Sequence, residues 1–237
     1  MYSIFKKEFD TFFTSAIGYL VIGLFLLFNG LILWFFKGGW NIFNTGFADM
    51  QGFFDSTPWL LLLLIPAITM RSFSDEYTTG TIEILKTKPI SDWQIVLGKF
   101  WATFVLIVIS LLPTLLYALS ISKLATPATI DWGSIFGSYL GLIALALSFS
   151  AIGLFTSILS TNQIISFLLG VLVSFLLFYG IEQWAIWYPN LPGFIQNNSL
   201  LAHYNSVAKG VLDSRDILYF LSICFLFLYL TKIKLDK

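Results

Sequence analysis

Charged residues are scarce in this 237-residue chain: 13 Lys and Arg with 13 Asp and Glu make 26, or 11% of the sequence, against about 25% in an ordinary soluble protein. This scarcity excludes a globular protein that is solvated over its whole surface. Hydrophobic residues instead make up 57%, enough for six membrane-spanning helices of about 20 residues each. The composition therefore predicts an all-α integral membrane protein that crosses the bilayer several times.

Other residues and patterns that are rare or missing narrow the function further. The net charge is +0 and no run of basic residues exists, which excludes nucleic acid as a partner because phosphate recognition needs clustered Lys and Arg. Cys224 is the only cysteine and His203 the only histidine, so an intramolecular disulfide and a cysteine-based metal site are excluded. We expect no catalytic residue and no metal, and interpret His203 as an interfacial polar residue and Cys224 as a small lipid-buried side chain.

The uncharged intervals between the charged residues predict six crossings, because a charged side chain at the bilayer centre costs several kcal/mol. The second crossing has two possible starts: it begins at Thr57-Pro58 and is short, or it begins earlier and carries Asp55. The uncharged stretch 132–181 is long enough for two helices joined by a polar turn at 157–163. The predicted membrane helices are about 15–36, 52–71, 98–122, 133–157, 162–182 and 215–232.

Two further elements accompany these crossings within a single predicted domain, 1–237. Aromatic side chains at helical spacing in residues 1–14 predict an N-terminal helix that lies flat in the membrane interface, although it could also be an extension of the first crossing. Residues 183–208 lack charge but contain Pro189 and Pro192. Broken backbone is unfavourable in hydrocarbon, so we expect a broken extracellular segment before the sixth helix.

The distribution of basic residues predicts the orientation. Six crossings place both termini on the same side, and an excess of Lys and Arg marks the cytoplasmic side. Nine basic residues fall on the side of the termini and four on the opposite side, so both termini are expected in the cytoplasm. The nine are Lys6, Lys7, Arg71, Lys86, Lys88, Lys99, Lys232, Lys234 and Lys237, and the four are Lys37, Lys123, Lys209 and Arg215.

One long cytoplasmic loop, 71–99, holds 8 of the 26 charged residues. Thr79-Gly80 is a break, after which Thr81 could cap a short helix, 81–87, that ends before Pro89. Ser91 followed by Gln94 is a capping box that would begin the third crossing. The sequence therefore predicts a short, stiff element between the second and third membrane helices.

The same loop, RSFSDEYTTGTIEILKTKPISDWQIVLGK, resembles that of the ABC-2 type transporter permeases. The family pattern is an acidic residue, Gly-Thr, a second acidic residue, Leu, Pro and a Gly-Lys that opens the next helix. The corresponding residues are Glu76, Gly80, Thr81, Glu83, Leu85, Pro89, Gly98 and Lys99. The resemblance covers the whole chain, and it is most similar to the gliding-motility-associated permease subunit of gliding bacteria.

The resemblance implies that residues 81–88 form a coupling helix, which docks into a groove of a separate ATPase subunit. It implies a permease in the bacterial inner membrane, surrounded by lipid, with two copies of the ATPase and a second permease that is identical or homologous. ATP and Mg would bind to the ATPase and no cofactor to this chain, which is then not an enzyme. The expected coupling residues are Glu76, Gly80, Thr81, Glu83, Leu85, Lys86 and Pro89.

Other patterns have plainer explanations. The chain has no G-x-x-x-x-G-K-[ST] motif, so any ATP hydrolysis requires a partner. Ser120 and Lys123 match the bare S-x-x-K spacing by chance. We interpret Glu182 as a residue at a solvated helix end rather than as a substrate contact. Small residues down the fourth helix, Gly133, Gly137 and Gly141, allow another helix to approach closely, more plausibly within this chain than in a second subunit.

Two classes of function stay open at this stage. One is the permease, which exports an undetermined substrate or does mechanical work. The other is a structural membrane anchor for a motility or secretion machine, suggested by the extracellular residues 183–216, which are rich in Asn and aromatic side chains. A stand-alone carrier is less well supported, because the predicted helices have almost no ionisable group at mid-membrane.

Overall fold

The computed structural model describes residues 1–45, 49–124, 131–187, 198–210 and 213–236, and every regular element in these ranges is a helix. Six helices are long and apolar enough to cross a membrane, so the prediction of an all-α protein with six crossings is confirmed. They are Ala16–Phe35, Gln51–Thr78, Asp92–Lys123, Trp132–Leu159, Gln163–Trp187 and Ser214–Asp236.

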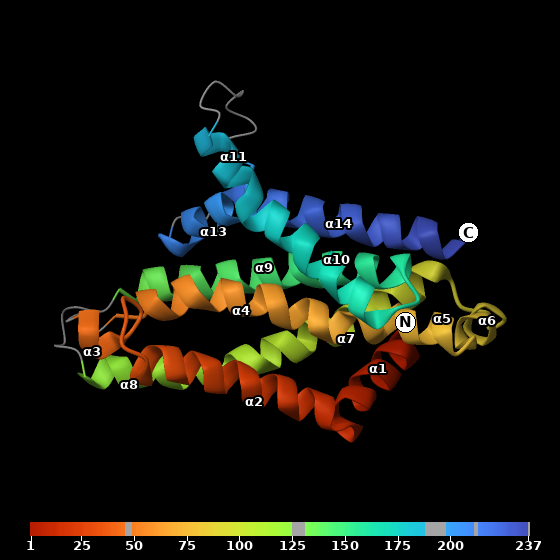
Figure 1. Ribbon diagram of the computed structural model, residues 1–237, viewed down its shortest axis with the longest axis horizontal. Helices are drawn as coiled ribbons and strands as arrows, with labels where there is room; N and C mark the ends of the chain where they lie inside the picture. The colour runs from red at the N-terminus through yellow and green to blue at the C-terminus, as the bar shows by residue number, and fades with distance from the viewer. Residues whose placement is uncertain (46–48, 125–130, 188–197, 211–212, 237) are drawn as a thin grey trace.

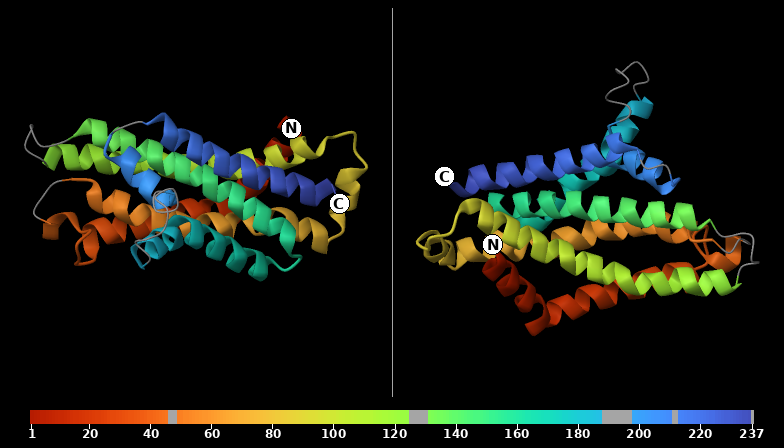
Figure 2. Two further views of the ribbon diagram at one scale, coloured as in Figure 1. Left: turned by 90° about the horizontal axis from the view of Figure 1, so that it is seen from above. Right: turned by 180° about the vertical axis from the view of Figure 1, so that it is seen from behind.

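The chain runs back and forth between two ends of an elongated helical bundle (Figure 1). Both termini and the helices α5 (Arg71–Thr78) and α6 (Thr81–Lys86) lie at one end, while α3 (Ile42–Thr45) lies at the other. The views from above and from behind show the same arrangement (Figure 2). An even number of crossings accounts for this placement of the two termini.

The first two helices meet in a V. Helix α1 (Tyr2–Thr14) ends at Ser15, whose extended backbone (φ −93°, ψ 161°) interrupts the helix, and whose side chain accepts a hydrogen bond from the Ile17 amide. Helix α2 (Ala16–Gly30) then begins the first crossing, which ends in the π-helical turn Leu31–Phe35. The helical expectation for residues 1–14 agrees with α1, and its position flat in the interface stays a prediction.

The second crossing begins at α4 (Gln51–Thr69), so it has the earlier of the two starts considered and carries Asp55 inside the helix. Pro58 lacks an amide hydrogen and therefore leaves the carbonyl of Phe54 without its helical donor. The hydroxyl of Tyr204, from α13 (Leu200–Ala208), donates to that carbonyl at 2.8 Å. A contact between distant segments thus satisfies the backbone that the proline leaves open.

The third crossing is bent by a proline. It consists of α7 (Asp92–Leu111), the 3-10 turn Leu112–Thr114 with Pro113, and α8 (Leu115–Leu124). Proline in a helix interior removes one backbone hydrogen bond and kinks the helix. The Thr114 hydroxyl lies 3.0 Å from that of Tyr139 on α9, which ties the bend to the next crossing.

Helix α9 (Trp132–Leu159) is the centre of the bundle and the most buried of the six crossings. It packs against α4, α7, α10 (Gln163–Phe175), α13 and α14 (Ser214–Asp236). Helices α2, α10 and α14 leave large apolar side chains exposed on their outer sides. These sides suit contact with lipid, because lipid solvates apolar surface that water does not.

The segment before the last crossing is more helical than expected. The fifth crossing continues through the π-helical turn Leu176–Gly180 into α11 (Ile181–Trp187), and α13 follows at 200–208. Asparagine and proline lower helix propensity only locally, so the aromatic and aliphatic residues on either side extend the helices. Pro189 and Pro192, which carried the expectation of a break, lie outside the described residues.

Candidate functional site

The turn between α5 and α6 depends on one glycine. Gly80 has φ +70° and ψ 5°, in the left-handed region that glycine adopts without steric cost. Gly80 is also the N-cap of α6, which has no side-chain cap, so the prediction that Thr81 caps this helix is wrong. The Thr81 hydroxyl instead lies 3.0 Å from that of Thr79, because the left-handed turn brings the two side chains together.

Helix α6 has a buried side and an exposed side. Ile82 is 6% exposed and belongs to the hydrophobic core, and Leu85 packs partly against that core. The exposed residues of this short segment include an acid in the first turn and a base in the last, which both suit the helix dipole. These exposed residues are Thr81, Glu83, Lys86, Lys88 and Pro89.

The third crossing begins as the sequence predicts. Ser91 and Gln94 form the capping box, with the Ser91 amide donating to Gln94 Oε1 at 3.3 Å. The cap defines where α7 starts, and the short linker 87–91 leaves α6 little freedom to move independently of α7. Helix α6 is therefore connected closely to the crossings on both of its sides.

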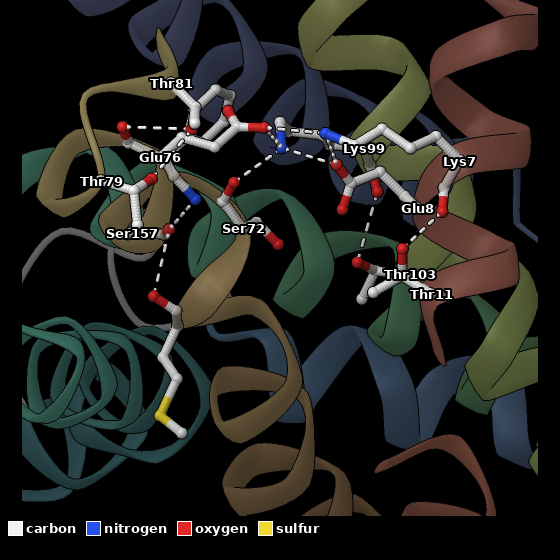
Figure 3. Close-up of polar contacts among 12 residues, drawn as sticks. Lys7, Glu8, Thr11, Ser72, Glu76, Thr79, Thr81, Lys99, Thr103 and Ser157 are labelled. Atoms are coloured by element: carbon white, nitrogen blue, oxygen red, sulfur yellow. Dashed lines mark hydrogen bonds and ion pairs between the residues drawn. The ribbon is translucent and has the colours of Figure 1, made fainter. Parts of the chain in front are cut away.

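A buried lysine joins three helices behind α6 (Figure 3). The Lys99 side chain on α7 is 1% exposed, and its Nζ lies 2.8 Å from Glu8 Oε1 on α1 and 2.9 Å from Glu76 Oε1 on α5. The third ammonium donor reaches the carbonyl of Ser72 at 2.7 Å. All three donors are thus used, as a buried charge requires. We name Lys99, Glu8 and Glu76 the Lys99 cluster.

Glu76, one of the expected coupling residues, faces the interior of the protein. The Glu76 side chain is 12% exposed and points towards Lys99, whereas Glu83 and Lys86 lie on the exposed surface. Glu8 was missed by the sequence analysis, and Lys99 was noted as one of the basic residues and as part of the Gly-Lys pair but not as a buried ion-pair partner. A signal for Lys99 did exist, because helical spacing places it on one face with the apolar residues Ile95 and Leu106, both of which are fully buried in the structure.

Helix α5 is also held from the opposite side. The Phe73 amide donates to Ser157 Oγ at 2.8 Å, and the hydroxyls of Ser74 and Ser166 lie 2.9 Å apart. The Thr78 hydroxyl donates to the carbonyl of Thr161 at 2.8 Å. These contacts bind α5 to the facing ends of α9 and α10 and to the turn between them, so α5, the helix that precedes α6, is joined to α1, α7, α9 and α10.

The small residues of α9 face another helix of the same chain. A Cβ atom built on Gly137 would lie 2.6 Å from the Val207 carbonyl oxygen, and one on Gly141 would lie 2.9 Å from the Tyr204 ring. Both neighbours belong to α13. Gly133 has only the Asp131 side chain nearby, at 3.2 Å. The close approach therefore occurs between α9 and α13. Burial and the nearby Asp55 raise the pKa of the Tyr204 phenol, which keeps it a hydrogen-bond donor.

The structure gives several isolated polar residues a different setting from the one expected. Cys224 is buried in the hydrophobic core of the protein, whereas the sequence analysis expected it to be buried in lipid. His203 Nδ1 lies 2.6 Å from Asp216 Oδ1, and its ring stacks on Tyr219. Glu182 is not at a helix end, because α11 continues to Trp187.

Metal ligands do not cluster in this protein: within the described ranges, no group of three or more His, Cys, Asp or Glu residues could hold a metal ion. The chemistry that is present consists of ion pairs, hydroxyl contacts and one short exposed helix.

Six apolar helices with a short exposed helix between the second and third define a polytopic membrane protein with a stiff element outside the bilayer. The family model described as ABC-2 family transporter protein matches residues 2–231, which is nearly the whole chain. The chain belongs to this family, whose members are membrane components of transporters and work with an ABC ATPase. No curated protein matches the sequence closely enough to refine this assignment.

Proposed function

We propose that this chain is the permease subunit that couples ATP hydrolysis by a separate ATPase subunit to export or mechanical work across the inner membrane. The observation that carries the proposal is the rigid mounting of α6. Its exposed side chains project from an element whose neighbour, α5, is bonded to Lys99 on one side and to Ser157 on the other. A push on α6 would reach several crossings at once, because buried ion pairs and packed helices move as units.

The proposed complex contains two ATPase copies and a second permease, identical or homologous, with both termini and α6 in the cytoplasm. The family membership supports an ATPase partner. The excess of basic residues at the end that holds both termini supports the orientation. The resemblance of the 71–99 loop supports a role linked to gliding motility.

Within this proposal, α6 contacts the ATPase through Thr81, Glu83 and Lys86, which are exposed. Gly80 provides the turn, Leu85 anchors the helix to the core, and Pro89 lies in the linker that follows the helix. Glu76 acts behind the contact surface, since its carboxylate is bound to Lys99.

Glu83→Arg tests the contact directly. We expect the amount of ATPase that copurifies from native membranes to fall about fivefold or more, because the variant reverses an exposed charge at the interface. The amount of permease in the membrane should not change, because the Glu83 side chain is exposed and its replacement disturbs no buried packing. Quantitative mass spectrometry measures both values, with peptides of the ATPase subunit counted in the purified complex and peptides of the permease counted in the membranes.

Asp10→Arg is the matched control, because Asp10 is also exposed and lies on α1 at the same end of the bundle. It should retain the ATPase at the level of the unmodified chain. Undiminished ATPase in Glu83→Arg, or equal loss in both variants, contradicts docking at α6. Function of the permease in cells whose ATPase cannot hydrolyse ATP would favour the structural anchor instead.

A further inference from the structure

A pocket of about 580 Å³ opens inside the V formed by α1 and α2, where these helices face α4 and α5. One part of its wall is apolar and comes from the two crossings, with Leu20 and Leu24 on α2 and Leu64 and Ile68 on α4. Leu20 and Leu24 are 57% and 41% exposed. The protein therefore leaves an unfilled apolar surface that is continuous with the outer face of α2.

The other part of the wall is charged and lies where the second crossing ends. Six ionisable side chains line it: Lys7, Arg71, Lys99, Glu8, Asp75 and Glu76. Four of them neutralise one another, because Lys99 pairs with both glutamates and Lys7 Nζ lies 3.5 Å from Glu76 Oε1. The two that remain are one cation, Arg71, and one anion, Asp75.

Arg71 and Asp75 lack ionic partners in the described part of the chain. Arg71 is exposed and has no carboxylate within ion-pair distance, and Asp75 accepts a hydrogen bond from the neutral amide of Gln163. The two residues are four apart on α5, so their side chains emerge one helical turn apart on the same face. They present a positive and a negative group side by side at the mouth of an apolar pocket.

We propose that this pocket binds one phospholipid with an ethanolamine headgroup. Arg71 binds the phosphate, for which its planar guanidinium provides paired donors, and Asp75 accepts hydrogen bonds from the primary ammonium. The two-carbon linker of the headgroup separates its two charges by a span that side chains one turn apart can reach. An acyl chain lies against Leu20, Leu24 and Leu64, where it covers apolar side chains that water at the membrane interface would otherwise contact.

The charge balance distinguishes this lipid from other membrane lipids. An anionic headgroup would satisfy Arg71 and leave Asp75 facing a second negative charge. A choline headgroup carries a positive charge but has no N–H to donate, so it cannot hydrogen-bond to the carboxylate. The ethanolamine headgroup alone among these three satisfies both residues.

The proposal is tested with the full chain, without any ATPase, so that its outcome is independent of the proposed function. The purified protein is reconstituted in nanodiscs with equal amounts of phosphatidylethanolamine, phosphatidylcholine and phosphatidylglycerol. It is then extracted again in detergent, and the lipid retained per chain is measured by mass spectrometry. We expect about one phosphatidylethanolamine per chain, enriched about tenfold over the other two, since tenfold matches one well-made hydrogen bond to a charged group.

Three variants and one control separate the parts of the site. Arg71→Gln should lower the retained phosphatidylethanolamine about tenfold. Asp75→Asn should retain lipid but lose the preference for ethanolamine over choline, and Leu64→Trp should fill the pocket and prevent retention of any lipid. Lys6→Gln is the matched control for Arg71, because Lys6 is exposed on α1 and does not line the pocket.

Several results would overturn the proposal. One is retained lipid that mirrors the composition of the nanodisc, and another is a preference for phosphatidylglycerol. A third is retention that Leu64→Trp leaves unchanged. Should Arg71→Gln fail to fold, the headgroup preference of Asp75→Asn still decides the outcome, because that substitution keeps the size of the side chain and changes only its charge.

Discussion

Lys99→Met is expected to lower the free energy of unfolding by about 3–5 kcal/mol, the usual result of removing one partner from a buried ion pair. The Lys99 side chain is 1% exposed, and its loss leaves Glu8 and Glu76 as neighbouring carboxylates with no buried cation between them. Titration of the purified protein from mild detergent into sodium dodecyl sulfate, followed by circular dichroism, measures the change.

Two further variants separate charge from packing. Lys7→Met removes a lysine that is 64% exposed, and surface ion pairs contribute only about 0–1 kcal/mol, so this control should unfold nearly as the unmodified chain does. The triple variant Glu8→Gln, Glu76→Gln, Lys99→Met removes the uncompensated charges and should recover much of the loss. Equal stability of Lys99→Met and Lys7→Met would contradict the structural role of the Lys99 cluster.

Gly137→Ala is expected to destabilise the protein by about 1–3 kcal/mol, the range for overfilling a packed interface. The added methyl group would lie 2.6 Å from the Val207 carbonyl oxygen. This neighbour is backbone and cannot rotate away, so α9 and α13 must separate. The same titration into sodium dodecyl sulfate measures the effect, and trypsin accessibility of the 198–210 region reports whether α13 has moved.

Gly23→Ala is the matched control. Gly23 is also helical, but beyond its own helix backbone and its two chain neighbours no atom lies within 4 Å of the position that its Cβ would occupy. Alanine is the better helix former by about 0.5–1 kcal/mol, so this variant should be as stable as the unmodified chain or more stable. Similar destabilisation in both glycine variants would show that helix geometry, rather than the contact between α9 and α13, sets the cost.

The long crossings could be predicted because their cause is local. Charged side chains are excluded from hydrocarbon, so the intervals between them indicate the membrane helices directly. Helix ends with strong signals were also predictable, as with Ser91 and Gln94. The extension to Trp187 was missed, because polar residues near a helix end weaken a pattern without stopping the helix.

The candidate site was predictable only in part. The residues of the 71–99 loop stand out by their charge and turn chemistry, and Gly80 was identified as the break. Which of those residues face inward was not predictable, since Glu76 and Glu83 are both acidic and lie in the same loop. Their difference follows from α1, which brings Glu8 to the Lys99 cluster from 91 positions away in the sequence.

The sequence by itself determined that this is a membrane protein with six helical crossings and a short helix between the second and third, because hydropathy and turn chemistry act over a few neighbouring residues. The tertiary structure alone decided that Lys99 is buried between two glutamates, that Tyr204 satisfies the backbone left open by Pro58, and that Arg71 and Asp75 have no ionic partner among the residues that the structure describes. Such pairings depend on which helices lie side by side. That arrangement is set by packing across the whole bundle, which no local pattern records.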